Sequence, residues 1–155
     1  MLFAELPAGS ELQLFVEADG TYRVYDGFFS FDDFPIAPGG ELQDGTGLLI
    51  KVPSDFTWIV VGSHKDNKQI PLYQFTSGTH TGFNWRSIAY HTTQASASGL
   101  WAELGSDVEI QTFVEANGTY RVYDGFFSFD DFPIVPGKPL LIKVPTTRNW
   151  TAAHY

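Results

Sequence analysis

The chain contains a near-exact internal repeat. Residues 15–39 read FVEADGTYRVYDGFFSFDDFPIAPG, and residues 113–137 read FVEANGTYRVYDGFFSFDDFPIVPG, an offset of 98 (113 minus 15). The match continues upstream at this offset, where LFAEL at 2–6 aligns with LWAEL at 100–104. Downstream the offset falls to 92: LLIKVP at 48–53 aligns with LLIKVP at 140–145, and Trp58 aligns with Trp150. The chain is therefore built from two copies of one supersecondary unit.

The repeat divides the 155 residues into copy one (2–60), a unique connecting segment (61–99) and copy two (100–155). No Pro/Ser-rich linker bounds either copy, and this length suits one compact domain. We therefore expect residues 1–155 to form a single compact domain with pseudo-twofold symmetry. The alternative is one complete unit plus a partial one, cut from a longer array.

Composition narrows the function classes. The net charge of -9 repels phosphate backbones and disfavours nucleic-acid binding. The absence of cysteine excludes disulfides and thiolate metal sites. No run approaches the ~20 apolar residues of a membrane span, so we expect no membrane insertion. The first residues have no basic region followed by a long apolar stretch, so no secretion signal is visible.

A β-hairpin opens each copy. In copy one, the strand-like runs 12–17 and 21–25 flank Ala18-Asp19-Gly20. We predict a three-residue loop with a left-handed Gly20, because it pairs Val16 with Tyr22 and Leu14 with Val24. The predicted core face carries Leu12, Leu14, Val16, Tyr22 and Val24. The predicted polar face carries Gln13, Glu17, Arg23 and Tyr25.

Further strands are predicted at 48–52, 56–61, 69–76 and 82–90, and residues 28–31 form a short aromatic strand or corner. A short helix is predicted at 95–104, with 2–6 as its truncated counterpart. We expect an all-β fold: an internally duplicated β-sandwich or barrel with pseudo-twofold symmetry and one short helix.

Paired carboxylates follow the hairpin in both copies, Asp32-Asp33 and Asp130-Asp131. Such a pair could bind calcium or a sugar hydroxyl. We favour a turn in which one aspartate bonds the backbone, because no calcium-loop spacing is present.

The unusual aromatic content, 16%, is concentrated around these carboxylates. Some rings must line a surface, a groove or the joint core between the copies, and these alternatives stay open. The candidate patch for a glycan or protein partner comprises Arg23, Tyr25, Phe28, Asp32 and Asp33 in copy one and Arg121, Tyr123, Phe126, Asp130 and Asp131 in copy two.

No motif points to catalysis. His64, His80, His91 and His154 have no metal-ligand spacing, and neither a nucleophile elbow nor a phosphate-cradling loop is present. We expect no catalytic residue, metal or cofactor.

The segment Gly82-Phe83-Asn84-Trp85-Arg86-Ser87-Ile88, followed by a short helix, a hairpin, a Pro-Gly turn and a Leu-Leu-Ile-Lys-Val strand, resembles repeat modules of secreted bacterial surface proteins. Those modules carry a G-W-N-W-x-S strand and a later P-G-x-G-Y-x-[IL]-K strand. Here Phe83 replaces the first Trp, and both copies lack the Gly-Tyr pair. The resemblance implies an extracellular, β-rich, non-catalytic role and transfers no functional residue.

Our first hypothesis is a structural or adhesion subunit of a virion (tail, fibre or capsid decoration) or of a surface assembly. It would bind itself, as a homo-oligomer, or other structural proteins. The second hypothesis is a duplicated, lectin-like module that binds glycans. The third is an enzyme that uses the unique segment 61–99. Under the first, the protein belongs to a virion or lies outside the cell or on its surface.

Overall fold

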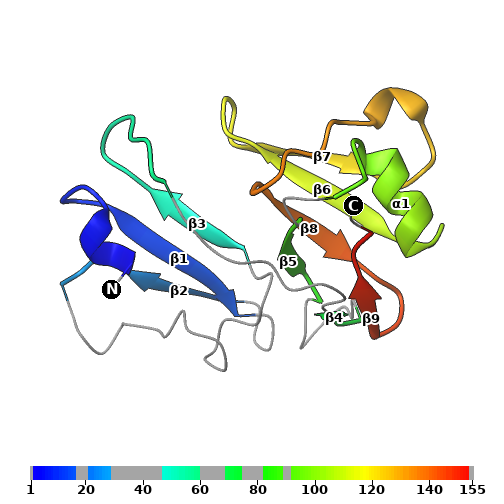
Figure 1. The fold of residues 1–155 in the computed structure, drawn as a ribbon, viewed down its shortest axis with the longest axis horizontal. Helices are drawn as coiled ribbons and strands as arrows, with labels where there is room; N and C mark the ends of the chain where they lie inside the picture. The colour runs from blue at the N-terminus through cyan, green and yellow to red at the C-terminus, as the bar shows by residue number, and fades with distance from the viewer. Residues whose placement is uncertain are drawn as a thin grey trace.

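The computed structural model describes residues 2–16, 21–28, 47–59, 69–74, 82–88 and 92–153. Within these ranges the chain is mostly β, with three sheets and one α-helix (Figure 1). The elements are, in order, η1 (Leu2–Glu5), β1 (Glu11–Val16), β2 (Thr21–Tyr25), β3 (Leu48–Lys51), β4 (Gln69–Leu72), β5 (Asn84–Ser87), α1 (Ala97–Leu104), β6 (Glu109–Val114), β7 (Thr119–Tyr123), η3 (Ser128–Asp130), β8 (Pro139–Lys143) and β9 (Arg148–Thr151).

Both copies form the same three-stranded antiparallel arrangement, with the first hairpin strand in the centre. Copy one gives the sheet β2-β1-β3, and copy two gives β7-β6-β8, to which β5 adds a fourth strand. The registers are equivalent: Leu12 pairs with Tyr25 and Ile50, as Ile110 pairs with Tyr123 and Ile142. β4 and β9 form a separate two-stranded sheet. No sheet of the described residues closes into a barrel.

The predicted hairpin register is wrong by one residue. Val16 pairs with Thr21, and Val114 pairs with Thr119, so four residues connect the strands instead of three. In copy two Gly118 does adopt the left-handed conformation (φ 68°) and donates its N–H to Val114 O at 2.9 Å. Its counterpart Gly20 lies outside the described residues.

This one-residue shift moves the β2 and β7 side chains to the opposite faces. Tyr123 is 8% exposed and makes an edge contact with Trp101 of α1, with ring centroids 6.2 Å apart. Tyr25 makes the equivalent contact with Phe3 of η1 at 4.8 Å. Tyr22 and Val24, predicted to be core residues, are both 42% exposed. The second tyrosine of each hairpin therefore packs inward against a ring of the preceding helix: Tyr25 against Phe3 of η1 and Tyr123 against Trp101 of α1.

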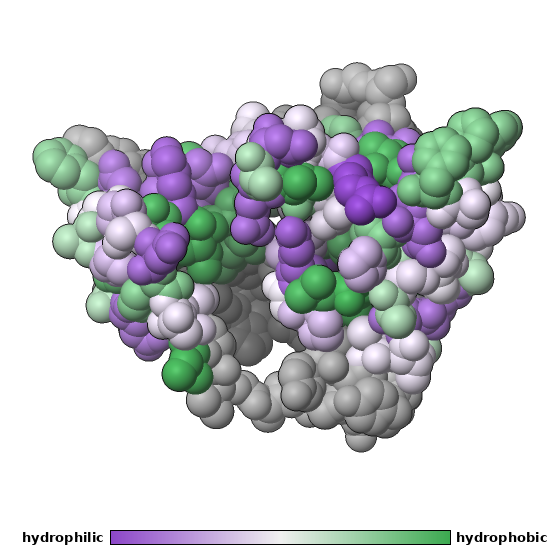
Figure 2. Space-filling view, turned by 90° about the horizontal axis from the view of Figure 1, so that it is seen from above, coloured by the Kyte–Doolittle hydropathy of each residue, from purple (hydrophilic) through white to green (hydrophobic). Residues whose placement is uncertain are grey.

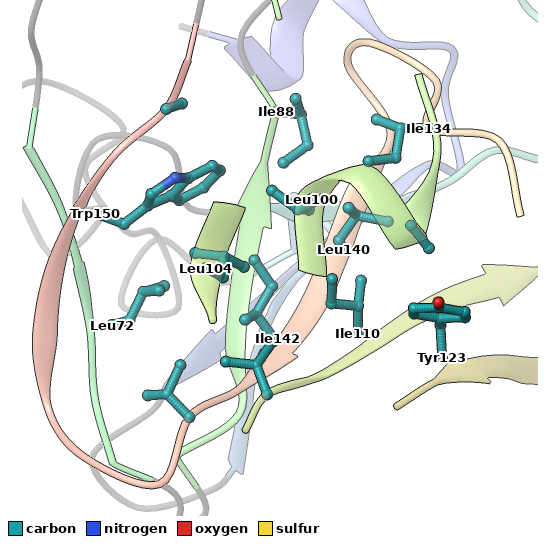
Figure 3. Close-up of a cluster of buried hydrophobic side chains, with 14 of the residues drawn as sticks. Leu72, Ile88, Leu100, Leu104, Ile110, Tyr123, Ile134, Leu140, Ile142 and Trp150 are labelled. Atoms are coloured by element: carbon teal, nitrogen blue, oxygen red, sulfur yellow. The ribbon is translucent and has the colours of Figure 1, made fainter. Parts of the chain in front are cut away.

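The main core lies in the half that contains copy two. It gathers side chains from α1, β4 and the strands β6–β9, and Leu100, Ile110 and Ile142 are fully buried in it (Figure 3). Copy one has a smaller cluster around Leu12 and Leu14. Its cover is the four-residue η1, where copy two has the eight-residue α1.

The structure confirms a helix within 95–104 and strands within 48–52, 69–76 and 82–90. Among the described residues, each of these elements is shorter than the range predicted for it. The strand predicted at 56–61 is not formed by residues 56–59, and residues 60–61 lie outside the described ranges. The aligned residues of copy two do form a strand, β9, because β4 pairs with it. The aromatic segment of copy two turns through η3 and is a corner.

The two larger sheets meet at a small cluster of Phe15, Trp85 and Leu141, with Phe83 packed against it. The ring centroids of Phe15 and Phe83 lie 6.3 Å apart. Gly47, just before β3, donates its N–H to Trp85 O of β5 at 3.1 Å. β5 therefore holds the two halves together.

Candidate functional site

The polypeptide leaves the hairpin of each copy through the same Asp-Gly-Phe turn. In copy two Asp124 Oδ1 accepts the N–H of Phe126 at 2.9 Å, and in copy one Asp26 Oδ1 accepts that of Phe28 at 2.9 Å. Gly125 between them has φ 83°, and a Cβ on it would collide with the Trp101 ring. The turn lets the backbone pass under Trp101 and directs the following phenylalanines outward.

Three rings of copy two then project into solvent, and we name Phe126, Phe127 and Phe129 the aromatic corner. Their side chains are 80%, 51% and 75% exposed. Phe127 stacks on Phe129 with centroids 5.0 Å apart and meets Phe126 edge-on at 5.4 Å. In copy one Phe28 is 79% exposed. Hydrophobic groups project at both ends of the long axis in Figure 2.

The two aspartates of copy two have different positions. Asp131 accepts hydrogen bonds from the N–H and the hydroxyl of Ser98, at 2.8 and 2.7 Å, in the first turn of α1. It therefore stabilises the helix N-terminus, next to Ser96, which caps Gly99 N–H. Asp130 ends η3 and lies at the surface depression described below. Asp32 and Asp33 lie outside the described residues.

The protonation of Asp131 follows from these contacts. Its partial burial on its own raises the pKa, but hydrogen bonds from Ser98, Phe132 and Ser96 outweigh it and lower the pKa below the ordinary aspartate value. Asp131 is thus held as a carboxylate by the helix that it caps.

Of the remaining candidate residues of copy two, one is buried and the other is held by contacts with neighbouring residues. Tyr123 belongs to the main core. Arg121 is exposed, donates to Asp131 O at 2.9 Å, and lies 5.8 Å from the centroid of the Phe132 ring. In copy one Tyr25 packs against Leu12 and Leu14, and Arg23 is exposed. The candidate patch is therefore not one continuous surface: Phe126, Asp130 and Arg121 line the outside, and Tyr123 and Asp131 support the fold.

An open depression of about 460 Å³ lies along β7 next to the aromatic corner. It is lined by Tyr120, Arg121, Val122, Asp124, Phe127 and Asp130. The sequence prediction missed Tyr120 and Val122 because the hairpin register placed both in the core. Asp124 and Phe127 could have been found from the Asp-Gly-Phe turn, which positions both.

Tyr22 and Tyr120 occupy equivalent positions on the hairpin faces that look toward the junction. The pKa of each is raised, chiefly by burial, although each ring is about 40% exposed (42% and 40%). A hydrogen bond with Trp85 opposes the shift at Tyr22, and the charge of Tyr22 adds to it at Tyr120. Both hydroxyls are therefore neutral near pH 7.

No group of three or more His, Asp or Glu that could hold a metal occurs among the described residues. His64, His80, His91 and His154 all fall outside those residues. None of the described helices is long and apolar enough to cross a membrane. Comparison of the chain with protein-family models, curated sequences and solved structures gives no match.

Proposed function

We propose that the protein is a non-catalytic assembly module that contacts copies of itself or other structural proteins through its aromatic corner. The observation that carries this proposal is the exposure of three adjoining phenylalanines, 80%, 51% and 75%, beside a core that buries other large rings. Exposed apolar clusters of this kind are typical of protein-protein contact sites. Stacking of Phe127 on Phe129 keeps the rings in a fixed arrangement, which lowers the entropy lost on contact.

Duplication supports a structural role because it presents similar contact groups twice. Phe28 in copy one projects from the same Asp-Gly-Phe turn as Phe126 in copy two. In this proposal the copies form two layers of a pseudo-twofold sandwich, joined at Phe15, Trp85 and Leu141. A module with contact groups at both ends suits a virion or a surface assembly, as does the resemblance of residues 82–88 to surface-protein repeats.

Light scattering over a concentration series tests the proposal. The chain should gain mass with concentration, and the double variant Phe126→Ser, Phe129→Ser should stay monomeric with an unchanged thermal unfolding curve. Val135→Ser is the matched control, because Val135 is 53% exposed but lies outside the corner. A protein that stays monomeric at every concentration would rule out self-assembly. If all variants associated equally, the aromatic corner would not be the contact site.

Glycan binding is a second candidate function, and the depression along β7 favours it. Its lining combines the rings of Tyr120 and Phe127 with the carboxylates of Asp124 and Asp130, the groups that stack on and hydrogen-bond to sugars. A glycan array probed with the chain and with Phe127→Ala should show binding that the variant loses. Tyr123→Ala is unsuitable here, because Tyr123 is 8% exposed and its loss would unfold the core. Absence of any bound glycan would exclude this function for the sugars on the array.

A further inference from the structure

Strands β3 and β8 have the same sequence but different surroundings. Residues 48–51 and 140–143 both read Leu-Leu-Ile-Lys, and both pair with the first hairpin strand of their copy in the same register. Ile142 is fully buried, whereas its counterpart Ile50 is 36% exposed. Leu140 and Leu141 are 2% and 6% exposed, whereas their copy-one counterparts are only half-buried. Part of the difference comes from the shorter cover of copy one, η1 in place of α1, and part from what lies beyond the outer edge of each strand.

In copy two, β5 covers the outer edge of β8 (Figure 1). Asn84, which is fully buried, donates its side-chain amide to Ile142 O at 2.9 Å and accepts the N–H of Tyr73, beyond β4, at 2.7 Å. Arg86, also fully buried, donates to Pro71 O of β4 at 2.8 and 3.2 Å. β4 in turn pairs with β9. Strands β4 and β5 thus complete the edge of copy two.

Copy one has no equivalent of β4 and β5 within the described residues. There β3 (48–51) pairs with β1 only among the described strands, and Gly47 directly before it donates its N–H to Trp85 O of β5, so the acceptor edge begins at Leu48. Residues 56–59, aligned with β9, belong to no strand. Apolar side chains in this segment are exposed: Phe56 is 43% and Ile59 is 79% exposed. By contrast, the hairpins are alike, since Tyr22 and Tyr120 are 42% and 40% exposed. The copies therefore differ at the side that β4 and β5 cover.

We propose that the outer edge of β3 is an acceptor for a strand with the side chains of β5, supplied by another unit of the same repeat. The acceptor residues are identical to those that β5 covers in copy two, so the same Asn side chain would meet the Ile50 carbonyl and the same Trp would pack over Leu49. Strand addition of this type gains main-chain hydrogen bonds and places side chains in fixed positions. The site is separate from the aromatic corner and does not rest on the proposed assembly role.

An extended chain tests this directly. Because Leu2 aligns with Leu100, a second copy of residues 69–99 placed before Leu2, in place of Met1, supplies the missing strands at high effective concentration. Hydrogen exchange should slow by about tenfold or more at the β3 amides, residues 48–51. The thermal midpoint should rise by roughly 5 °C. The matched control carries Asn84→Ala and Arg86→Ala in the added segment only, and its β3 amides should exchange as in the unextended chain.

Three outcomes would overturn the proposal. Unchanged exchange at β3 in the extended chain would mean that the edge does not accept the strand. Equal protection by the control extension would mean that the β5 side chains do not matter. A dimer of the unextended chain that protects β3, and that Ile50→Lys dissociates, would make a second β3 the occupant instead. Variants of Phe126 and Phe129 should leave all these readouts unchanged, which separates this site from the aromatic corner.

Discussion

The indole Nε1 of Trp150 donates a hydrogen bond of 2.7 Å to Glu103 Oε1, and Trp58 Nε1 donates one of 2.9 Å to Glu5 Oε2. The two pairs occupy equivalent places in the two copies, 47 and 53 residues apart in sequence. In copy two Trp150 is 6% exposed, and Glu103 also accepts from Ala153 N–H and the Gln94 side chain. The copy-one pair is exposed. One interaction thus exists in a buried and an open version within one molecule.

Glu103→Ala should lower the free energy of unfolding by about 1–3 kcal/mol, because it leaves the buried Trp150 N–H without an acceptor. Glu5→Ala, the matched change in copy one, should cost less than about 1 kcal/mol, because water can replace the carboxylate there. Urea unfolding curves of both variants measure the difference. Equal costs would contradict the buried character of the copy-two pair.

Gly125→Ala should destabilise the fold by about 2–3 kcal/mol, since it combines a left-handed backbone with a collision against Trp101. Gly137→Ala separates the two effects: Gly137 has the same φ of 83°, but a Cβ on it meets nothing within 4 Å. That variant should cost about 1 kcal/mol. Thermal unfolding followed by circular dichroism decides between them. If both variants lose the same stability, the contact with Trp101 contributes nothing.

Asp131→Asn should lower stability at pH 7 by about 0.5–1 kcal/mol, near the low end for a helix cap because solvent screens the carboxylate. The folded pKa of Asp131 is lowered, so its contribution is fully present above the usual aspartate value of about 3.9. The contribution disappears as pH falls through the lower folded pKa. The unfolding curves of the wild type and of the Asp131→Asn variant should therefore converge in acid.

Asp130→Asn is the control for this prediction, because Asp130 is the neighbouring carboxylate and lies at the end of η3, along the surface depression. This variant should stay within about 0.5 kcal/mol of the wild type at pH 7. A loss of stability at pH 7 that also vanishes in acid for Asp130→Asn would argue against a specific cap by Asp131.

Asn84→Ala should cost roughly 2–4 kcal/mol, because three backbone carbonyls and one N–H lose their partner in a fully buried place. Asn149→Ala, at an exposed position of β9, should stay within about 0.5 kcal/mol of the wild type. Chemical denaturation measures both. A mild effect at Asn84 would mean that water takes over its bonds and that β5 is not held by this side chain.

The repeat made much of the architecture predictable. Aligned residues such as Trp58 and Trp150 occupy equivalent positions, and the repeated strand around 48–52 is present. The strand around 82–90 and the helix within 95–104, which lie wholly or partly in the unique segment, were predicted from their local sequence patterns. The hairpin faces were not predictable from alternation alone. Placing Tyr22 and Val24 inside gives a consistent apolar face, but Phe3 and Trp101 offer ring contacts to Tyr25 and Tyr123 instead. Tertiary packing of a distant helix therefore decided the register.

The candidate site was predicted only in part for the same reason. Phe28 and Phe126 are exposed as a binding surface requires, but the register error assigned Tyr25 and Tyr123 to the outside. One aspartate of the pair does bond a backbone N–H, but Asp131 accepts that of Ser98 at the N-terminus of α1 and not, as the sequence predicts, one of its own turn. Sequence spacing could not reveal this, because Ser98 lies 33 residues away.

Identical hairpin strands have a consequence for folding. β2 and β7 are both Thr-Tyr-Arg-Val-Tyr, so β1 would make the same contacts with either strand. The entropic free-energy cost of closing the short loop from Val16 to Thr21 is about 3 kcal/mol lower than that of closing the much longer loop from Val16 to Thr119. That difference selects the local partner during folding. Covalent connectivity, and not the chemistry of the strands, therefore keeps the two copies from exchanging their hairpins.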